Sequence, residues 1–175
     1  MRNSKTSQMV AAALLAAATA VLAQIILPLG PVPFSLAAFG VFFMGFTLSA
    51  KYAAASVCVY LFLGFIGVPV FASFGAGPAV LAGPTGGYVL GYFAMAVLPA
   101  FARRHKLPAP LVFLAALAGL CACYAVGTVW YSFLTGQPVA AALGICVFPF
   151  ILPDIVKAAL AMWLAAAVRK RSSYH

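Results

Sequence analysis

Long apolar stretches, separated by short segments that hold nearly all the charge, constrain this chain more than any other feature of its sequence. A stretch of about 20 apolar residues is long enough for a helix to cross the roughly 30 Å hydrocarbon core of a membrane. Only 6% of the 175 residues are charged and 66% are hydrophobic, a combination foreign to ordinary soluble domains. The sequence therefore predicts an all-α integral membrane protein, with residues 1–175 forming a single domain.

Residues that break helices divide the apolar stretches into six predicted membrane helices. The expected helices cover residues 9–27, 34–48, 52–66, 88–101, 111–134 and 139–168. As one straight helix the last stretch would be about 45 Å long, which exceeds the thickness of the hydrocarbon core. Because Pro149 and Pro153 interrupt this stretch, we expect the last helix to break at these prolines.

The cations predict how these six helices are oriented. Nine of the ten fall on the same side of the membrane, whereas the loops on the other side carry no charge. These nine are Arg2, Lys5, Lys51, Arg103, Arg104, Lys106, Arg169, Lys170 and Arg171. Since loops rich in Lys and Arg stay in the cytoplasm, both termini are expected there, in a bacterial cytoplasmic membrane. A signal peptide ending near Ala23 is an alternative interpretation of the first helix.

Composition also argues against two other classes of site. The cations form no basic face interleaved with aromatic residues, so we expect no nucleic-acid partner. The four cysteines lie inside apolar stretches, where a free thiol behaves as a small hydrophobic group, so we expect neither a metal site nor a cofactor.

The tenth cation, Lys157, lies within the last apolar stretch, three residues after Asp154, the only acidic residue in the chain. An ionisable group at mid-membrane costs about 2.5 to 3.5 kcal/mol on insertion scales, so such groups usually face an interior cavity. The spacing puts both side chains on one helix face, nearer the outer surface. We therefore predict a ligand site that loads from outside. Alternatively, Asp154 caps a half-helix that starts after Pro153, and Lys157 balances its charge.

A connection rich in glycine and proline, residues 67–87, is the second candidate. Irregular backbone inside a membrane is tolerated where it is buried in protein or lines a cavity. Its amides could bind the oxygen atoms of a ligand, although a tight turn would explain the composition as well. The connection lacks the Gly-Lys-Ser/Thr ending of a phosphate-binding loop, so energy must come from another protein. An enzyme within the membrane is disfavoured because no second catalytic group accompanies Asp154 there.

A strip of small residues runs along the first predicted helix. Ala12, Ala16 and Ala20 recur at intervals of four, which allows another helix to approach closely. Docking of a partner subunit and packing within the chain both explain this strip.

Four segments together resemble the BioY family, the biotin-specific S components of energy-coupling-factor transporters. The segments are Pro31-Val-Pro33, Gly67-Val-Pro-Val-Phe71, Gly83-Pro-Thr-Gly-Gly-Tyr88, and Phe148-Pro-Phe-Ile-Leu-Pro-Asp154 with Lys157. They fall in the order and approximate spacing of that family over nearly the whole chain. The resemblance implies a non-enzymatic six-helix S-component fold that captures biotin from outside. It also implies two kinds of partner, a transmembrane T component and two ABC-type ATPases.

The same resemblance implies roles for individual residues. Asp154 and Lys157 would hold the polar head of biotin, and the alanine strip of the first helix would contact the T component. The loop over residues 75–87 would form the lid or floor of the site. Candidate apolar walls are Phe71, Phe74 and Tyr88.

The chain departs from the family pattern at several positions expected near biotin. Some members carry Asn in the glycine loop and Arg after the Gly-Gly-Tyr motif, where this chain has Gly75 and Val89. Many have Thr-Leu-Gln where this chain has Ser35-Leu36-Ala37. The resemblance then favours the backbone amides near Thr85, Gly86 and Gly87 as anchors for the biotin carboxylate. An S component for another vitamin and a purely structural subunit are the remaining alternatives.

Overall fold

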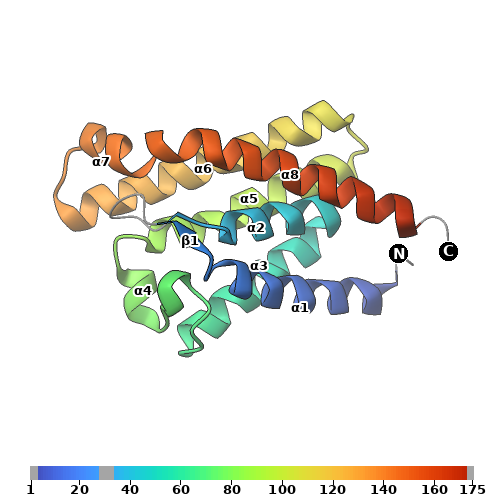
Figure 1. Ribbon diagram of the computed structural model, residues 1–175, viewed down its shortest axis with the longest axis horizontal. Coiled ribbons are helices and arrows are strands. Elements are labelled where there is room, and N and C mark those ends of the chain that lie inside the picture. Colours follow the sequence, from blue (N-terminus) through green and yellow to red (C-terminus); the bar gives the residue numbers. More distant parts are fainter. Residues whose placement is uncertain (1–3, 28–33, 173–175) are drawn as a thin grey trace.

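The computed structural model describes residues 4–27 and 34–172, and helices dominate both ranges. Six helices of eleven residues or more form one bundle (Figure 1). They are α1 (Lys5–Leu22), α2 (Ala37–Thr47), α3 (Ala50–Phe65), α5 (Gly86–Arg104), α6 (Ala109–Thr135) and α8 (Phe148–Ser172). The shorter elements lie toward the left-hand end of the bundle in Figure 1. They are the antiparallel strands β1 (Ile26–Leu27) and β2 (Phe34–Ser35), the 3₁₀ turn η1 (Ala72–Phe74), α4 (Pro78–Ala82) and α7 (Val139–Cys146).

Three of these helices, α1, α6 and α8, are long and apolar enough to cross a membrane, and α2 and α3 are shorter apolar helices. The predicted all-α membrane fold is confirmed, whereas the number of six crossings stays a prediction. With 11 residues, α2 measures about 16 Å, roughly half of a hydrocarbon core. Because eight of its residues are buried, this short helix forms the centre of the bundle and contacts α1, α5 and α8.

The observed helix ends differ from the predicted ones. The first helix ends at Leu22 rather than at residue 27, because the chain then pairs with β2. Pro28, the helix-breaking residue that directly follows the predicted helix, and the Pro31–Pro33 motif lie outside the described residues. The predicted irregular connection contains η1 and α4, and α5 already begins at Gly86.

The predicted break in the last stretch is present, and it lies at Val147, two residues before Pro149. Val147 has φ −123° and ψ −57°, which ends α7 before α8 starts at Phe148. Pro149 lies in the first turn of α8, where its missing N–H would have had no helical partner. Pro153 lies one turn later and is accommodated inside the helix.

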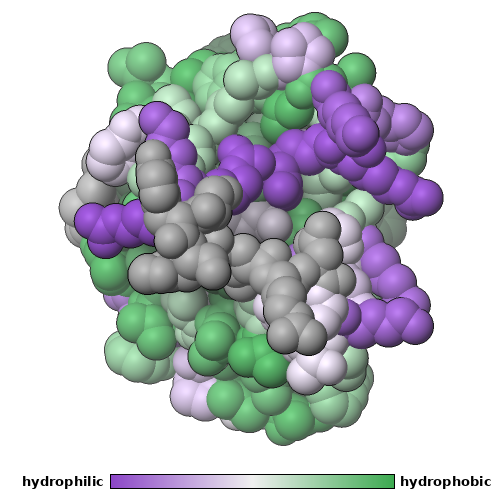
Figure 2. All heavy atoms as spheres, turned by 90° about the vertical axis from the view of Figure 1, so that its right-hand side faces the viewer, coloured by the Kyte–Doolittle hydropathy of each residue, from purple (hydrophilic) through white to green (hydrophobic). Residues whose placement is uncertain are grey.

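The cationic segments gather at the end of the bundle where α1 begins and α5 and α8 end, at the right in Figure 1. Figure 2 faces this end and shows hydrophilic residues spread across it. The exposed cations among the described residues are Lys5, Lys51, Arg104, Lys106, Arg169, Lys170 and Arg171. Arg103 instead reaches inward and donates to the carbonyl oxygens of Gly45 at 3.4 Å and Leu48 at 3.2 Å. These carbonyls belong to the last turn of α2, so Arg103 satisfies acceptors that the helix leaves unpaired.

Close packing between α2 and α5 depends on Gly45. A Cβ atom at this position would come within 2.7 Å of both the Ala96 carbonyl oxygen and Cγ of Pro99. Neither the backbone oxygen nor the proline ring can move aside without a shift of α5, because helix interfaces are densely packed. The contact therefore sets the distance between these two central helices.

We expect Gly45→Ala to lower the free energy of unfolding by about 1 to 3 kcal/mol, because the added methyl group overpacks the interface. The matched control is Gly144→Ala in α7, where a Cβ atom would meet nothing within 4 Å. This control should be neutral or stabilise by up to about 1 kcal/mol, since alanine has the higher helix propensity. Thermal unfolding of the two detergent-solubilised variants measures the difference, and equal midpoints would contradict the packing argument.

Candidate ligand-binding site

An open cavity lies at the end of the bundle opposite the cations. Its walls come from the N-terminal parts of α2, α5 and α8, the C-terminal half of α3, the middle of α6, and strand β2. Because α2 is short, its start at Ala37 forms a floor, and the longer helices continue past it as walls.

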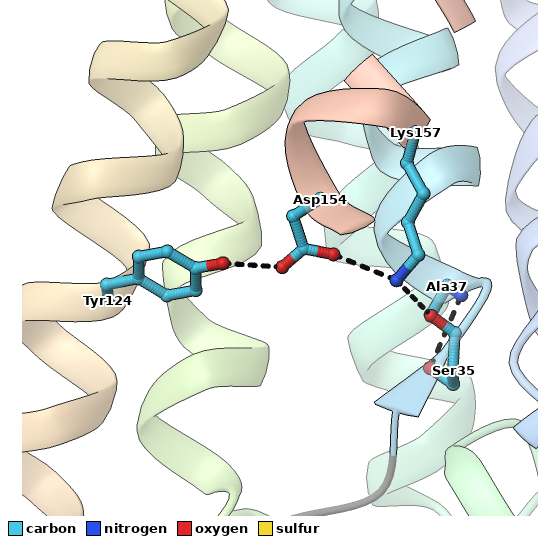
Figure 3. Close-up of polar contacts among 5 residues, drawn as sticks. All are labelled: Ser35, Ala37, Tyr124, Asp154 and Lys157. Carbon is cyan, nitrogen blue, oxygen red and sulfur yellow. Dashed lines mark hydrogen bonds and ion pairs between the residues drawn. The ribbon is translucent and has the colours of Figure 1, made fainter. Parts of the chain in front are cut away.

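Polar groups from three elements meet at the cavity wall (Figure 3). The ammonium group of Lys157 donates to Oδ1 of Asp154 and to the carbonyl oxygen of Ser35, both at 2.8 Å. The hydroxyl of Tyr124 donates to Oδ2 of Asp154 at 2.7 Å. Asp154 and Lys157 come from α8, Tyr124 from α6 and Ser35 from β2, so the network ties these elements together.

Both charged groups of this network are buried, with 7% of Asp154 and 6% of Lys157 exposed. A buried charge is tolerated when it is paired and when hydrogen bonds satisfy its remaining groups. The Lys157 ammonium also lies 3.5 Å from the centroid of the Phe34 ring, which attracts a cation through its π face. Phe34 in turn stacks on Phe150 of α8, with 5.7 Å between the ring centroids. Aromatic rings thus surround the charged pair on the side of β2.

The helix-capping alternative for Asp154 does not hold. Since α8 begins at Phe148, Asp154 lies in its second turn rather than at its N-cap. Its two oxygens accept hydrogen bonds from Tyr124 and Lys157. The carboxylate therefore belongs to the cavity wall.

The two charged groups differ in what they can still offer a ligand. An ammonium has three donors, and Lys157 uses two of them in hydrogen bonds while its remaining side faces Phe34. A carboxylate has about four acceptor positions, and Asp154 uses one on each oxygen for the contacts described. Asp154 therefore retains acceptor capacity for N–H groups in the cavity, whereas Lys157 is largely engaged with the protein.

The other predicted ligand-binding residues separate into two groups. Phe71, Thr85 and Tyr88 line the cavity together with Asp154 and Lys157. Phe74 does not contribute to the wall, because its side chain points away and is 70% exposed. Gly75 is likewise absent from the residues that line the cavity, although it pairs with Phe71 in a short β-bridge.

Gly86 and Gly87 serve close packing at the start of α5. A Cβ atom on Gly86 would overlap the carbonyl oxygen of Leu81, and one on Gly87 would overlap the side chain of Trp130. The Gly86 amide donates to the carbonyl oxygen of Gly83 at 3.0 Å, so it is not free for a ligand as the sequence had suggested. The packing of α4, α5 and α6 thus accounts for the two glycines.

The alanine strip of α1 packs inside the subunit, so the prediction that it forms a partner face was wrong for its central residues. Ala12 and Ala16 are only 6% and 1% exposed, and Ala20 is partly buried. Ser56 of α3 donates to the carbonyl oxygen of Ala12 at 2.7 Å, which holds the two helices close together. The exposed side of α1 instead carries Met9, Val10, Ala13, Leu14, Ala17 and Val21.

The sequence interpretation missed Tyr124 and the contributions of Phe34 and Ser35. A tyrosine inside a membrane helix is a signal, because its hydroxyl needs a hydrogen-bond partner when buried. That signal could have singled out Tyr124, but several tyrosines share it, and nothing local identifies Asp154 as the partner of this one. Ser35 contributes its backbone carbonyl, a group that every residue has, so the sequence could not identify this contact.

Comparisons with known proteins match nearly the whole chain. The family model described as BioY family matches residues 1–174. A probable biotin transporter BioY from Pyrococcus horikoshii is 41% identical, over 92% of this chain and 95% of the relative. The biotin transporter BioY from Thermotoga maritima is 35% identical, over 93% of this chain and 96% of the relative. A solved structure, the S-component for biotin from an ECF-type ABC transporter, matches with a TM-score of 0.88 and 28% identity, over 97% of this chain and 94% of its own.

The buried pair predicts a double-mutant cycle on stability. Asp154→Asn and Lys157→Met should each lower the free energy of unfolding by about 3 to 5 kcal/mol, because each leaves one buried charge uncompensated. The double variant should recover part of this loss, since it removes both charges. Thermal unfolding in detergent, at constant pH and salt, gives the three values. Strictly additive effects would show that the two side chains do not interact as the distances indicate.

Proposed function

Because this chain belongs to the BioY family, we propose that it binds biotin in the cavity beside Asp154 and captures it for uptake into the cell. The observation that carries the proposal is the charged pair that lines an otherwise mostly apolar cavity. A member of this transporter family is not an enzyme. We expect its binding role to need neither a metal nor a cofactor.

The chemistry of biotin suits the two kinds of wall in this cavity. The ureido ring of biotin presents two N–H donors, and Asp154 has the acceptor capacity to receive them. Lys157 donates hydrogen bonds to Oδ1 of Asp154 and to the carbonyl oxygen of Ser35, and so holds both groups in place. Phe71 and Tyr88 offer aromatic surface to the apolar part of the ligand. Thr85 adds a hydroxyl where α5 begins, and is our candidate to meet the carboxylate of the ligand.

The charge distribution supports an orientation with both termini in the cytoplasm. Exposed cations gather at one end of the bundle, and such segments stay on the cytoplasmic side of a bacterial cytoplasmic membrane. The cavity lies at the opposite end. In this orientation biotin enters from the extracytoplasmic side.

Transport then requires partners that supply energy. We place a transmembrane T component and two ABC-type ATPases in this role, by analogy with the ECF-type transporter whose S-component has the same fold. The exposed side of α1 is our candidate contact with the T component, because small residues such as Ala13 and Ala17 lie there among larger apolar ones.

We expect Asp154→Asn and Lys157→Ala each to weaken biotin binding at least tenfold, which corresponds to about 1.4 kcal/mol. The first removes the charged acceptor, and the second removes the ammonium group that positions this acceptor through a hydrogen bond. Titration calorimetry on the detergent-solubilised variants measures both affinities. Lys51→Ala, which removes an exposed lysine at the start of α3, is the matched control and should bind as the wild type does. Wild-type affinity in both site variants would reject Asp154 and Lys157 as the biotin site.

A competition experiment separates biotin from other vitamins. Radiolabelled biotin bound to the wild-type protein should be displaced by unlabelled biotin and not by thiamine, riboflavin or folate, because their polar groups do not match one ureido ring. Displacement by another vitamin at lower concentration would identify an S component of different specificity. The complete absence of binding by any of the four would favour a structural subunit.

A further inference from the structure

The segment between α3 and α4 forms one wall of the cavity, and contacts with Tyr60 of α3 hold it in place. Phe71 and Ala72 line the cavity, and the Phe71 side chain is only 2% exposed. Its ring packs edge-on against Tyr60, with 5.6 Å between centroids, and the Tyr60 hydroxyl donates to the carbonyl of Val70 at 3.0 Å. The position of this segment therefore decides the shape of the cavity on this side.

A single side chain, Gln24, ties the same segment to α1. Its Nε2 donates to the carbonyl oxygens of Phe71 at 3.1 Å and Ala20 at 3.0 Å, with Pro69 further away at 3.4 Å. Its Oε1 accepts the backbone N–H of Phe74 at 2.9 Å. The oxygen and the nitrogen of one side-chain amide thus connect the end of α1 to the segment between α3 and α4. Local sequence does not predict this connection.

The segment that Gln24 holds has an unfavourable backbone conformation. Ser73 and Phe74 have φ of 58° and 54°, in the left-handed region that residues other than glycine rarely adopt. Such a conformation persists when the surroundings hold it in place. The ring of Phe74 cannot do so, since it is 70% exposed. The Phe74 N–H donates a hydrogen bond to Oε1 of Gln24, which lies outside the segment. This contact helps to hold the segment in its unfavourable conformation.

We propose that Gln24 is a positioning residue of the ligand site, which holds residues 69–75 in the cavity wall and so slows the release of the ligand. The inference rests on the proposed function, because it takes the cavity as the biotin site. Without the amide of Gln24, residues 73 and 74 relax toward ordinary φ values, Phe71 loses one of its anchors, and the wall opens more often. The expected effect is on dissociation, because the opening of a wall releases a ligand that is already bound.

The experiment compares Gln24→Met, which keeps the length of the side chain and removes its amide, with Gln8→Met. Gln8 lies near the other end of α1, where its Oε1 accepts the N–H of Ser49 at 3.2 Å, far from the cavity. Dissociation of radiolabelled biotin after a chase with unlabelled biotin should be about fivefold faster or more in Gln24→Met and unchanged in Gln8→Met. Thermal midpoints of the two variants serve to show that both remain folded.

Hydrogen exchange on the protein without ligand provides a second readout. Peptides that cover residues 69–75 should exchange faster in Gln24→Met, whereas those from α5 and α6 should not change. In Gln24→Glu, the carboxylate still accepts the Phe74 N–H but cannot donate to the carbonyl of Phe71. Protection at residue 74 should therefore return in this variant, and biotin should still dissociate faster than from the wild type.

Unchanged exchange of residues 69–75 in Gln24→Met overturns the proposal, and so does faster exchange with an unchanged dissociation rate. Because exchange is measured without ligand, it tests the Gln24 contacts even if the wild-type protein fails to bind biotin. Failure of the wild type to bind would reject the proposed function, and is thereby distinguished from a failure of the Gln24 proposal.

Discussion

A carboxylate and an ammonium group buried together in apolar surroundings form the interaction on which the rest of this structure depends. The transfer of each ion out of water costs several kcal/mol, and attraction between the two offsets this only with good geometry and further hydrogen bonds. Tyr124, the carbonyl of Ser35 and the ring of Phe34 supply those additional contacts. Since these groups come from α6 and β2, the pair on α8 requires three elements to meet at one point.

The space beside this pair arises from the unequal lengths of the central helices. The short α2 ends its apolar surface at Ala37, while α5, α6 and α8 continue past it. The gap that remains is closed at the sides by strand β2 and by the segment that carries Phe71. Both are irregular or short elements, which a membrane tolerates only where protein or a cavity satisfies their backbone groups. The fold and the site thus follow from one arrangement. The short helix α2 leaves a space, and the backbone of β2 and of the Phe71 segment borders that space.

The two ends of the bundle have opposite chemistry, and this asymmetry gives the binding site a direction. One end carries the exposed cations, with Arg103 turned inward to the carbonyls that end α2. The other holds the cavity, whose charged lining residues, Asp154 and Lys157, neutralise each other. A ligand with polar N–H groups and an apolar body meets matching surfaces only at the second end. The direction of uptake that we propose follows from this difference.

The sequence by itself determined the membrane class of the protein, the grouping of its cations, and the choice of Asp154 and Lys157 as candidate site residues. These conclusions rest on the cost of placing each residue type in hydrocarbon, which depends little on where the rest of the chain goes. Only the tertiary structure decided that Tyr124 faces Asp154, that Ser35 accepts from Lys157, and that Phe74 points away from the cavity. It also decided that Ala16 packs against the protein's own helices and that the last stretch breaks at Val147. Such facts depend on how helix faces far apart in the chain are turned toward one another, and Ser35 and Lys157 are separated by 122 residues. Hydropathy carries no information about that rotation, because nearly every face of these helices is apolar.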